Sequence, residues 1–303
     1  MKTNKWVREG VIFSPNSQHD FAKSHAMVPT PLQIDDKTWR IYYSSRNSKN
    51  QSAIFWFNLR LGNSFSIEET SKEPILMPGR LGCFDDNGVT PSCLIYLRDG
   101  SLAMYYIGWN PGSTTRVNLY GGLAISRDHG LSFERWSEAP ILERCQSDPL
   151  INTAPWVIQV DGIYRMFYVS GTSWESKDEP RYLIKTATSH DGLVWIREGK
   201  IAVDYDGQYE TALARPYVIH LDGKWWMWFS SKRGYYSIKT AQSEDCLIWH
   251  RSNSDFDLDP NLELDEKCMV EYAAIINTKD KIWMLYNGDD YGKNGISLAW
   301  RNV

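Results

Sequence analysis

The sequence predicts an all-β fold, namely a five-bladed β-propeller that residues 1–303 form as a single domain. Two observations lead to this prediction. A hairpin pattern recurs along the chain at near-equal spacing, and the N-terminal segment matches a segment that follows the strands of a later repeat. Strand-rich repeats of this length are typical of propellers, in which each repeat is one blade. A long β-sandwich with coincidental hairpins is the alternative.

The clearest hairpin spans residues 215–231, where two apolar and aromatic runs flank Asp222-Gly223. An Asp-Gly pair between such runs is the strongest short-range sign of a two-residue hairpin turn. The same pattern recurs, more weakly at the last two positions, at Asp161-Gly162, Asp99-Gly100, Asp35-Asp36 and Lys279-Asp280. An aromatic residue marks the second strand of every repeat, at Tyr43, Tyr106, Tyr168, Phe229 and Tyr286.

A third strand follows each hairpin, and in three repeats a turn then leads to an aromatic residue. The turns run from Ser126 to Phe133, from Ser189 to Trp195 and from Ser243 to Trp249. Their Ser and Asp side chains suit the hydrogen bonds of a tight connection. We expect these turns to be structural, the aromatic residues to pack between neighbouring blades, and a short fourth strand to follow.

The two ends of the chain complement each other. The last repeat stops after a third strand at 295–299, whereas Trp6-Val7-Arg8-Glu9-Gly10 matches Trp195-Ile196-Arg197-Glu198-Gly199 at the start of a fourth strand. We therefore expect the N-terminal strand to pair into the last blade and close the ring. Closure removes the open sheet edge that a radial array would otherwise leave.

Composition excludes several classes of protein. The net charge is -4 and no basic stripe is present, so nucleic acid is not an expected partner. No run resembles a secretory signal or approaches the length of a membrane span. The five cysteines contain no CxxC pair, which favours a reducing cytoplasm. We expect a cytoplasmic protein without a membrane partner, a metal or a cofactor, because no zinc spacing appears either.

Polar residues recur just before each first strand, where a propeller gathers its loops at one end of the central channel. His25, Asp85 and Glu210 occupy the same offset before the proline of their repeats, Asp86 follows Asp85, and Glu271 opens the last inner strand. A carboxylate among apolar residues is costly unless it is used or paired. For Glu210, an ion pair with the nearby Arg215 is the alternative to a functional role.

Carboxylates around one cavity suit the cleavage of a glycosidic bond. One carboxyl donates a proton to the leaving oxygen, and another activates water or attacks the anomeric carbon. Indole rings stack on sugars, and cationic or polar side chains hold substrate groups. The expected substrate-binding residues are His25, Arg46, Asp85, Trp109, Asn152, Trp174, Arg215 and Asp290.

The pattern as a whole resembles that of the five-bladed propeller glycosidases, which include arabinanases, xylosidases, invertases and mannoside phosphorylases. The resemblance spans the chain and lies in the proline-started inner strands, the paired aromatic residues of the second strands and the Ser-x-Asp-Gly-x-x-Trp turns. It implies a glycoside hydrolase that acts on a small carbohydrate or sugar conjugate in the channel. Glu210 resembles the general acid in position, and Asp86 or Glu271 would be the base or nucleophile.

One departure keeps two alternatives open. The family places a catalytic Asp directly before the first inner strand of blade one, whereas this chain has Val28-Pro29 there, with His25 nearby. The chain could instead be a non-catalytic propeller that binds a carbohydrate or nucleotide sugar in glycan biosynthesis. It could also be a glycoside phosphorylase, in which phosphate replaces water and Lys232-Arg233 is a candidate anion site.

Overall fold

The strands of the computed structural model form antiparallel sets that follow one another along the chain. The structure describes residues 5–15, 19–261, 263–264, 266 and 268–303. Among these residues the only helix is the short α1 (Asp289–Gly292), so the fold is all-β as predicted. No helix in the described ranges is long and apolar enough to cross a membrane.

The bounds of the strands define the sets. The first set contains β2 (Ser24–Gln33), β3 (Thr38–Arg46), β4 (Ser52–Leu61) and β5 (Phe65–Thr70). The second contains β6 (Gly88–Tyr96), β7 (Leu102–Pro111), β8 (Val117–Ser126) and β9 (Glu134–Arg135). The third contains β10 (Asn152–Val160), β11 (Ile163–Ser176), β12 (Glu179–Ser189) and β13 (Ile201–Val203). The fourth contains β14 (Ala212–Leu221), β15 (Lys224–Arg233), β16 (Tyr235–Ser243) and β17 (His250–Ser252).

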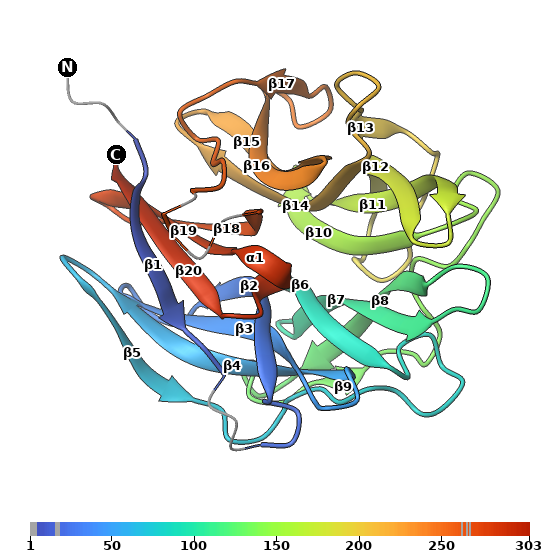
Figure 1. Cartoon of the computed structure of the whole chain (residues 1–303), viewed down its shortest axis with the longest axis horizontal. Coiled ribbons are helices and arrows are strands. Elements are labelled where there is room, and N and C mark those ends of the chain that lie inside the picture. Colours follow the sequence, from blue (N-terminus) through green and yellow to red (C-terminus); the bar gives the residue numbers. More distant parts are fainter. Residues whose placement is uncertain (1–4, 16–18, 262, 265, 267) are drawn as a thin grey trace.

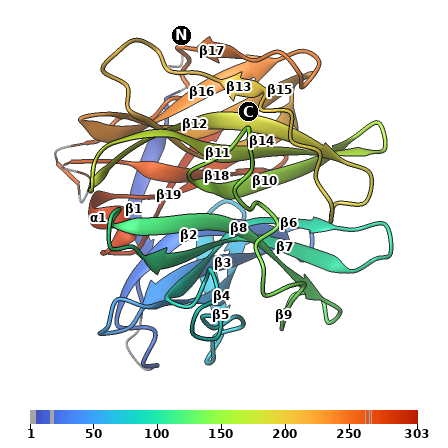
Figure 2. The same cartoon turned by 90° about the vertical axis from the view of Figure 1, so that its right-hand side faces the viewer.

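The last set joins the two ends of the chain. It contains β18 (Glu271–Asn277), β19 (Lys281–Asn287), β20 (Ile296–Asn302) and β1 (Val7–Phe13). β1 pairs antiparallel with β20, with Val7 opposite Trp300, so the predicted closure by the N-terminal strand is confirmed. Figure 1 shows the sets around a common centre, with the first strand of each set innermost. Figures 1 and 2 both show the blue β1 beside the red C-terminal strands.

The hairpins form largely where the sequence predicts them. Asp161-Gly162 and Asp222-Gly223 have positive φ at both residues, as a type I′ turn requires, and they connect β10 to β11 and β14 to β15. The prediction of a two-residue turn at Asp99-Gly100 is wrong, because β6 ends at Tyr96 and β7 begins only at Leu102. The intervening turn is held by Asp99, whose carboxylate accepts hydrogen bonds from Ser101.

The Ser-Asp turns are structural, as predicted. The hydroxyl of the serine donates to the aspartate two residues later, at 2.7 Å for Ser126, 2.9 Å for Ser189 and 3.0 Å for Ser243. The aromatic residue that follows then packs between neighbouring sets. The ring centroids of these pairs are 5.9 Å apart for Tyr42–Phe133, 6.0 Å for Tyr105–Trp195 and 5.3 Å for Phe167–Trp249.

Inner strands carry a bulge that turns one side chain toward the centre. Val28, Ala154, Arg215 and Tyr272 have positive φ, and the register of their strands shifts at these residues. The guanidinium of Arg215 therefore reaches two other sets, where it donates to the carbonyl of Pro29 at 2.8 Å and to that of Ala273. The alternative of an ion pair between Arg215 and Glu210 is wrong, because the bulge points Arg215 inward.

Buried carboxylates tie the loop before the inner strand of a set to its outermost strand. Each accepts hydrogen bonds from a second-strand hydroxyl and pairs with a cation near the fourth strand; we call such a pair a clasp. The ion pairs of the clasps are Asp85–Arg135, Asp148–Arg197, Glu210–Arg251 and Glu266–Arg8. Asp148 departs from the pattern in part, because Lys185 of β12 lies closer to it, at 2.8 Å, than Arg197, at 3.7 Å. The hydroxyl donors include Tyr106, Tyr168, Ser231 and Tyr286. All four carboxylates are buried, so the clasps fix these loops.

We expect Arg251→Met to lower the free energy of unfolding by about 3 kcal/mol, because it removes the cation that donates to both oxygens of the buried Glu210 and leaves only Arg233, at 3.9 Å. Urea unfolding of the two proteins measures this difference. The matched control is Arg80→Met, which breaks the exposed pair with Glu138 and should change stability little. Equal effects of the two substitutions would contradict a stabilising role for the clasp.

Candidate functional site

Glu271 is the one sequence-predicted carboxyl that stays unpaired inside the protein. It opens β18 directly before the bulge at Tyr272, and its side chain has no exposed surface. Neither carboxyl oxygen has a hydrogen-bond partner among the described residues. Because native proteins satisfy nearly all buried polar groups, an unpaired carboxyl indicates a site.

Side chains from two other sets surround Glu271. Lys232 at the end of β15 and the phenols of Tyr236 and Tyr182, from β16 and β12, lie within electrostatic range of it. The hydroxyls of Tyr182 and Tyr236 form a hydrogen bond with each other, and the Lys232 ammonium lies 5.7 Å from the Tyr236 ring centroid. Burial raises the pKa of Glu271 well above its usual value of 4.5, and the adjacent Tyr272 side chain and then Lys232 oppose the shift only in part. Glu271 is therefore a candidate proton donor.

The first set contributes a cation, Arg46, and an imidazole, His25, to the same region. Arg46 at the end of β3 lies near Tyr272 and Tyr291, and burial lowers the pKa of its guanidinium. His25 in β2 has its pKa lowered to about 4, first by burial and then by Arg46 and Lys293. A neutral imidazole and a guanidinium thus face the segment that carries Tyr291.

The segment named α1 supplies the last predicted residue. Asp290 and Tyr291 both adopt left-handed backbone, with φ of 53° and 60°. Such conformations are costly in residues other than glycine and cluster at functional sites. They bring Asp290 to His25, where its negative charge raises the pKa of the imidazole against the larger lowering effects. Tyr272 has Glu271, Arg46 and Tyr291 as electrostatic neighbours, and His25 has Arg46 and Asp290. These interactions group four of the predicted residues, His25, Arg46, Glu271 and Asp290, in one region.

The structure gives Glu210 a different environment from Glu271. Arg251 donates to both of its carboxylate oxygens at 2.7 Å, Ser231 donates to one oxygen, and the backbone of Asp206 donates to the other at 2.6 Å. These contacts leave little of the carboxylate to face a ligand. The role of general acid stays a prediction for Glu210, and the geometry favours pairing.

The neighbouring acids Asp85 and Asp86 are also engaged. Asp85 belongs to the clasp with Arg135, at 2.9 Å, and its other oxygen is buried without a partner among the described residues. The half-buried Asp86 accepts from the backbone of Gly82 at 2.8 Å and so stabilises its own turn. Neither carboxylate contacts the Glu271 cluster in any hydrogen bond or ion pair between described residues.

The other residues predicted to bind substrate are packed against, or hydrogen-bonded to, neighbouring parts of the protein. Trp109 donates from its indole to Ser52 at 2.9 Å. Trp174 packs beside Tyr182 against the buried residues Ile151, Ala154 and Val169. Asn152 is buried and donates to the carbonyl of Asp148 at 2.9 Å. Arg215 fills the centre, with its guanidinium 5.5 Å from the Trp156 ring centroid.

Sequence reasoning missed the tyrosines of the site. Tyr182 and Tyr236 lie near the start of consecutive third strands, each followed two residues later by Ile-Lys-Thr-Ala. That repeat was a signal that the two phenols occupy equivalent positions near the inner end of their strands. Tyr272 follows Glu271 directly, but its positive φ is a tertiary feature that the sequence does not reveal.

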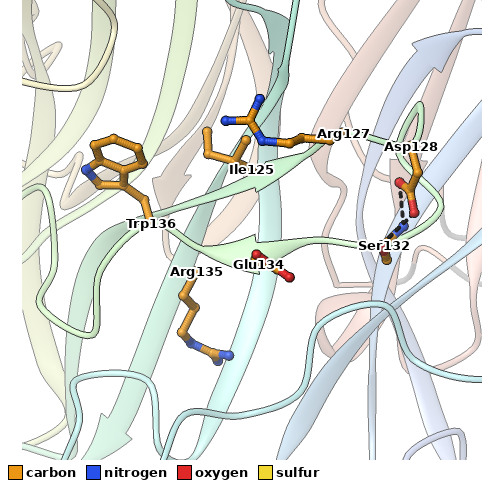
Figure 3. A pocket seen from close by; sticks show the side chains of 7 residues that line it. All are labelled: Ile125, Arg127, Asp128, Ser132, Glu134, Arg135 and Trp136. Carbon is orange, nitrogen blue, oxygen red and sulfur yellow. Dashed lines mark hydrogen bonds between the residues drawn. The ribbon is translucent and has the colours of Figure 1, made fainter.

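A separate hollow of about 370 Å³ lies on the outer strands β8 and β9. Figure 3 shows Asp128 hydrogen-bonded to Ser132 at one end of it and Trp136 at the other. Arg135 on its wall already belongs to the Asp85 clasp. In the described ranges no group of three or more His, Cys, Asp or Glu side chains is arranged to hold a metal ion.

Comparison with known proteins places the chain in a family. No protein-family model matches it. The uncharacterized protein Rv1502 of Mycobacterium tuberculosis is 37% identical over 295 residues, which are 97% of this chain and 98% of that protein. The chain belongs to the Rv1502 family. A 1,2-beta-oligomannan phosphorylase of Thermoanaerobacter is 25% identical over 227 residues, 74% of this chain and 72% of the enzyme.

Solved structures identify the fold of this Rv1502 family member. A glycoside hydrolase matches 97% of the chain and 90% of its own length, with a TM-score of 0.75 and 17% identity. A structure from work on the GH130 family of mannoside phosphorylases and hydrolases that target beta-1,2 mannosidic linkages matches 98% of the chain and 90% of its own length, with a TM-score of 0.67 and 16% identity. The protein therefore has the propeller-type fold of these glycoside hydrolases, in agreement with the resemblance found in the sequence.

The ionisation of Glu271 predicts a pH dependence of stability. Above pH 4.5 the unfolded chain releases the proton that folded Glu271 retains, so this residue costs stability increasingly as the pH rises toward its folded pKa. We expect the free energy of unfolding of the wild type to fall with rising pH relative to that of Glu271→Gln. Urea unfolding of both proteins at a series of pH values measures this, and parallel pH profiles would contradict it.

Proposed function

We propose that the protein is a carbohydrate-active enzyme that cleaves a glycosidic bond by phosphorolysis, with Glu271 as the general acid. The observation that carries the proposal is the buried Glu271 carboxyl, which has Lys232 as its nearby cation and lies next to Tyr272, whose other neighbours include Arg46. A carboxyl that keeps its proton at neutral pH can protonate a leaving oxygen.

The architecture in this proposal is a single five-bladed propeller. Each four-stranded set is one blade, and the last blade contains the N-terminal strand. The loops before the innermost strands then meet at one end of the central axis. Support comes from the electrostatic neighbours of Glu271 in the last set, namely Tyr182 of the third set and Lys232 of the fourth. His25 of the first set neighbours Asp290, which follows the second strand of the last set.

Phosphate fits the site better than water as the attacking group. Hydrolysis requires a second carboxylate to activate water. Asp85 and Glu210 are held in clasps, Asp86 stabilises its turn, and Asp290 pairs with Lys293 at 3.8 Å. Inorganic phosphate is already an anionic nucleophile, and it needs cations such as Lys232 and Arg46 to hold it.

Phosphorolysis would transfer the sugar from the glycosidic oxygen to phosphate. A phosphate oxygen forms a bond to the anomeric carbon while the bond from that carbon to the glycosidic oxygen breaks. The proton of Glu271 moves to the leaving oxygen, so the products are a sugar 1-phosphate and a saccharide shortened by one unit. Glu271 is left ionised and recovers its proton from solvent or product.

The proposed substrate class is a β-1,2-linked mannoside. The relative named 1,2-beta-oligomannan phosphorylase and the structure associated with beta-1,2 mannosidic linkages support this choice. Neutral His25 and the phenols of Tyr182 and Tyr236 offer donors and acceptors for sugar hydroxyls.

Incubation with β-1,2-linked mannotriose tests the proposal, with product analysis in the presence and absence of inorganic phosphate. We expect mannose 1-phosphate only when phosphate is present, and a loss of kcat of about 10²–10⁴-fold in Glu271→Gln, because the proton donor is removed. Glu210→Gln, assayed where it remains folded, should keep kcat within about tenfold.

Other outcomes would assign other functions. Free mannose formed without phosphate would identify a hydrolase. Loss of turnover in Glu210→Gln with retention in Glu271→Gln would make Glu210 the acid that the sequence suggests. Binding of the mannoside without any turnover would identify a sugar-binding propeller.

A further inference from the structure

We propose a second sugar-binding site on the fourth set, separate from the Glu271 site and suited to neutral saccharides. A pocket of about 510 Å³ lies between β15, β16, β17 and the segment that contains Asp206. This volume falls within the range of small-molecule sites in proteins. The proposal of this second site does not depend on whether Glu271 is the catalytic acid.

The sheet of the fourth set separates this pocket from Glu271. Successive side chains of a strand point to opposite faces. Ser231 and Arg233 of β15 and Ser237 and Lys239 of β16 line the pocket. Lys232, which lies between the first two, instead faces Tyr236 and Glu271. A ligand in the pocket therefore contacts the opposite face of β15 and β16 from a ligand beside Glu271.

Each of the three cations that line the pocket is paired with a carboxylate. Arg233 pairs with Asp206, Lys239 pairs with Asp259 at 2.9 Å, and Arg251 pairs with the buried Glu210 at 2.7 Å. An anionic or cationic ligand would have to displace one of these partners. A neutral ligand that is rich in hydroxyl groups can instead hydrogen-bond to the pairs without breaking them.

Hydroxyl and amide groups complete the lining. Ser237, Ser252 and Asn253 contribute side chains that both donate and accept hydrogen bonds. This composition matches the hydroxyl groups of a sugar ring, each of which also donates and accepts. An apolar ligand would leave these groups without water or a partner, which is unfavourable.

Tyr235 supplies the aromatic surface that a sugar ring requires. Gly234, with φ of 87°, forms the turn between β15 and β16, where Arg233 pairs directly with Tyr235. The turn leaves the side chain of Tyr235 at the pocket with 56% of its surface exposed. A phenol ring exposed to this extent can stack on the apolar face of a pyranose while the pocket hydroxyls bind its edge.

Titration calorimetry with uncharged and charged saccharides tests the site. The uncharged probes are tetraoses built from mannose, glucose, galactose or xylose, and the charged probes are glucuronate, glucosamine and mannose 6-phosphate. We expect at least one uncharged probe to bind at a site whose affinity falls about tenfold in Tyr235→Ala, because the stacking surface is removed. Tyr235→Phe should retain the affinity.

Tyr96→Ala is the matched control, because Tyr96 is also an exposed tyrosine but lies at the end of β6 and outside the pocket. It should leave every affinity unchanged. The proposal is overturned if no uncharged probe shows binding that depends on Tyr235, or if the charged probes bind more tightly there. It is also overturned if Tyr96→Ala weakens binding as much as Tyr235→Ala.

Discussion

The pairing of a buried carboxylate with an arginine is the interaction on which the rest of the structure depends. Asp85, Asp148, Glu210 and Glu266 each lie before an inner strand and reach a cation near the outermost strand of the same set. A buried carboxylate without such a partner would cost several kcal/mol, on the order of 3–5. The pairs therefore hold the loops that carry the candidate site against the edges of their sheets.

The clasps also change how acidic residues in this fold are interpreted. Recurrence at equivalent positions suggested a shared catalytic centre, but the same recurrence follows from a structural device that the second to fifth sets repeat. Glu271 differs from the clasped acids because it begins the inner strand itself and has no arginine opposite it. The catalytic candidate is thus the acid that departs from the repeat, which accords with the view that local rules fail at functional sites.

Much of the fold could be predicted from local patterns. The Asp-Gly turns, the Ser-Asp turns and the match between Trp6-Val7-Arg8 and Trp195-Ile196-Arg197 each encode structure within a few residues. The partner of Glu210 could not be found in this way, because Arg251 lies far along the chain. A usable signal did exist, since Arg8, Arg135, Arg197 and Arg251 each follow an aromatic residue by two positions.

The site itself depends on geometry that no local pattern expresses. The bulge at Tyr272 and the left-handed Asp290 and Tyr291 set the neighbours of Glu271, and each such residue costs on the order of 1–3 kcal/mol. Arg215 adopts the same kind of conformation and joins β14 to β2 and β18 at the centre. The strained residues are thus held by contacts between sets, which only the assembled fold provides.

The ionisation state of Glu271 tests the central claim most directly. Infrared difference spectra between the wild type and Glu271→Gln at neutral pH isolate the carboxyl of this residue. The account predicts the carbonyl band of a protonated carboxyl in the wild type that the variant lacks, because Glu271 is buried without a hydrogen-bond partner among the described residues. Carboxylate bands in its place would contradict the account.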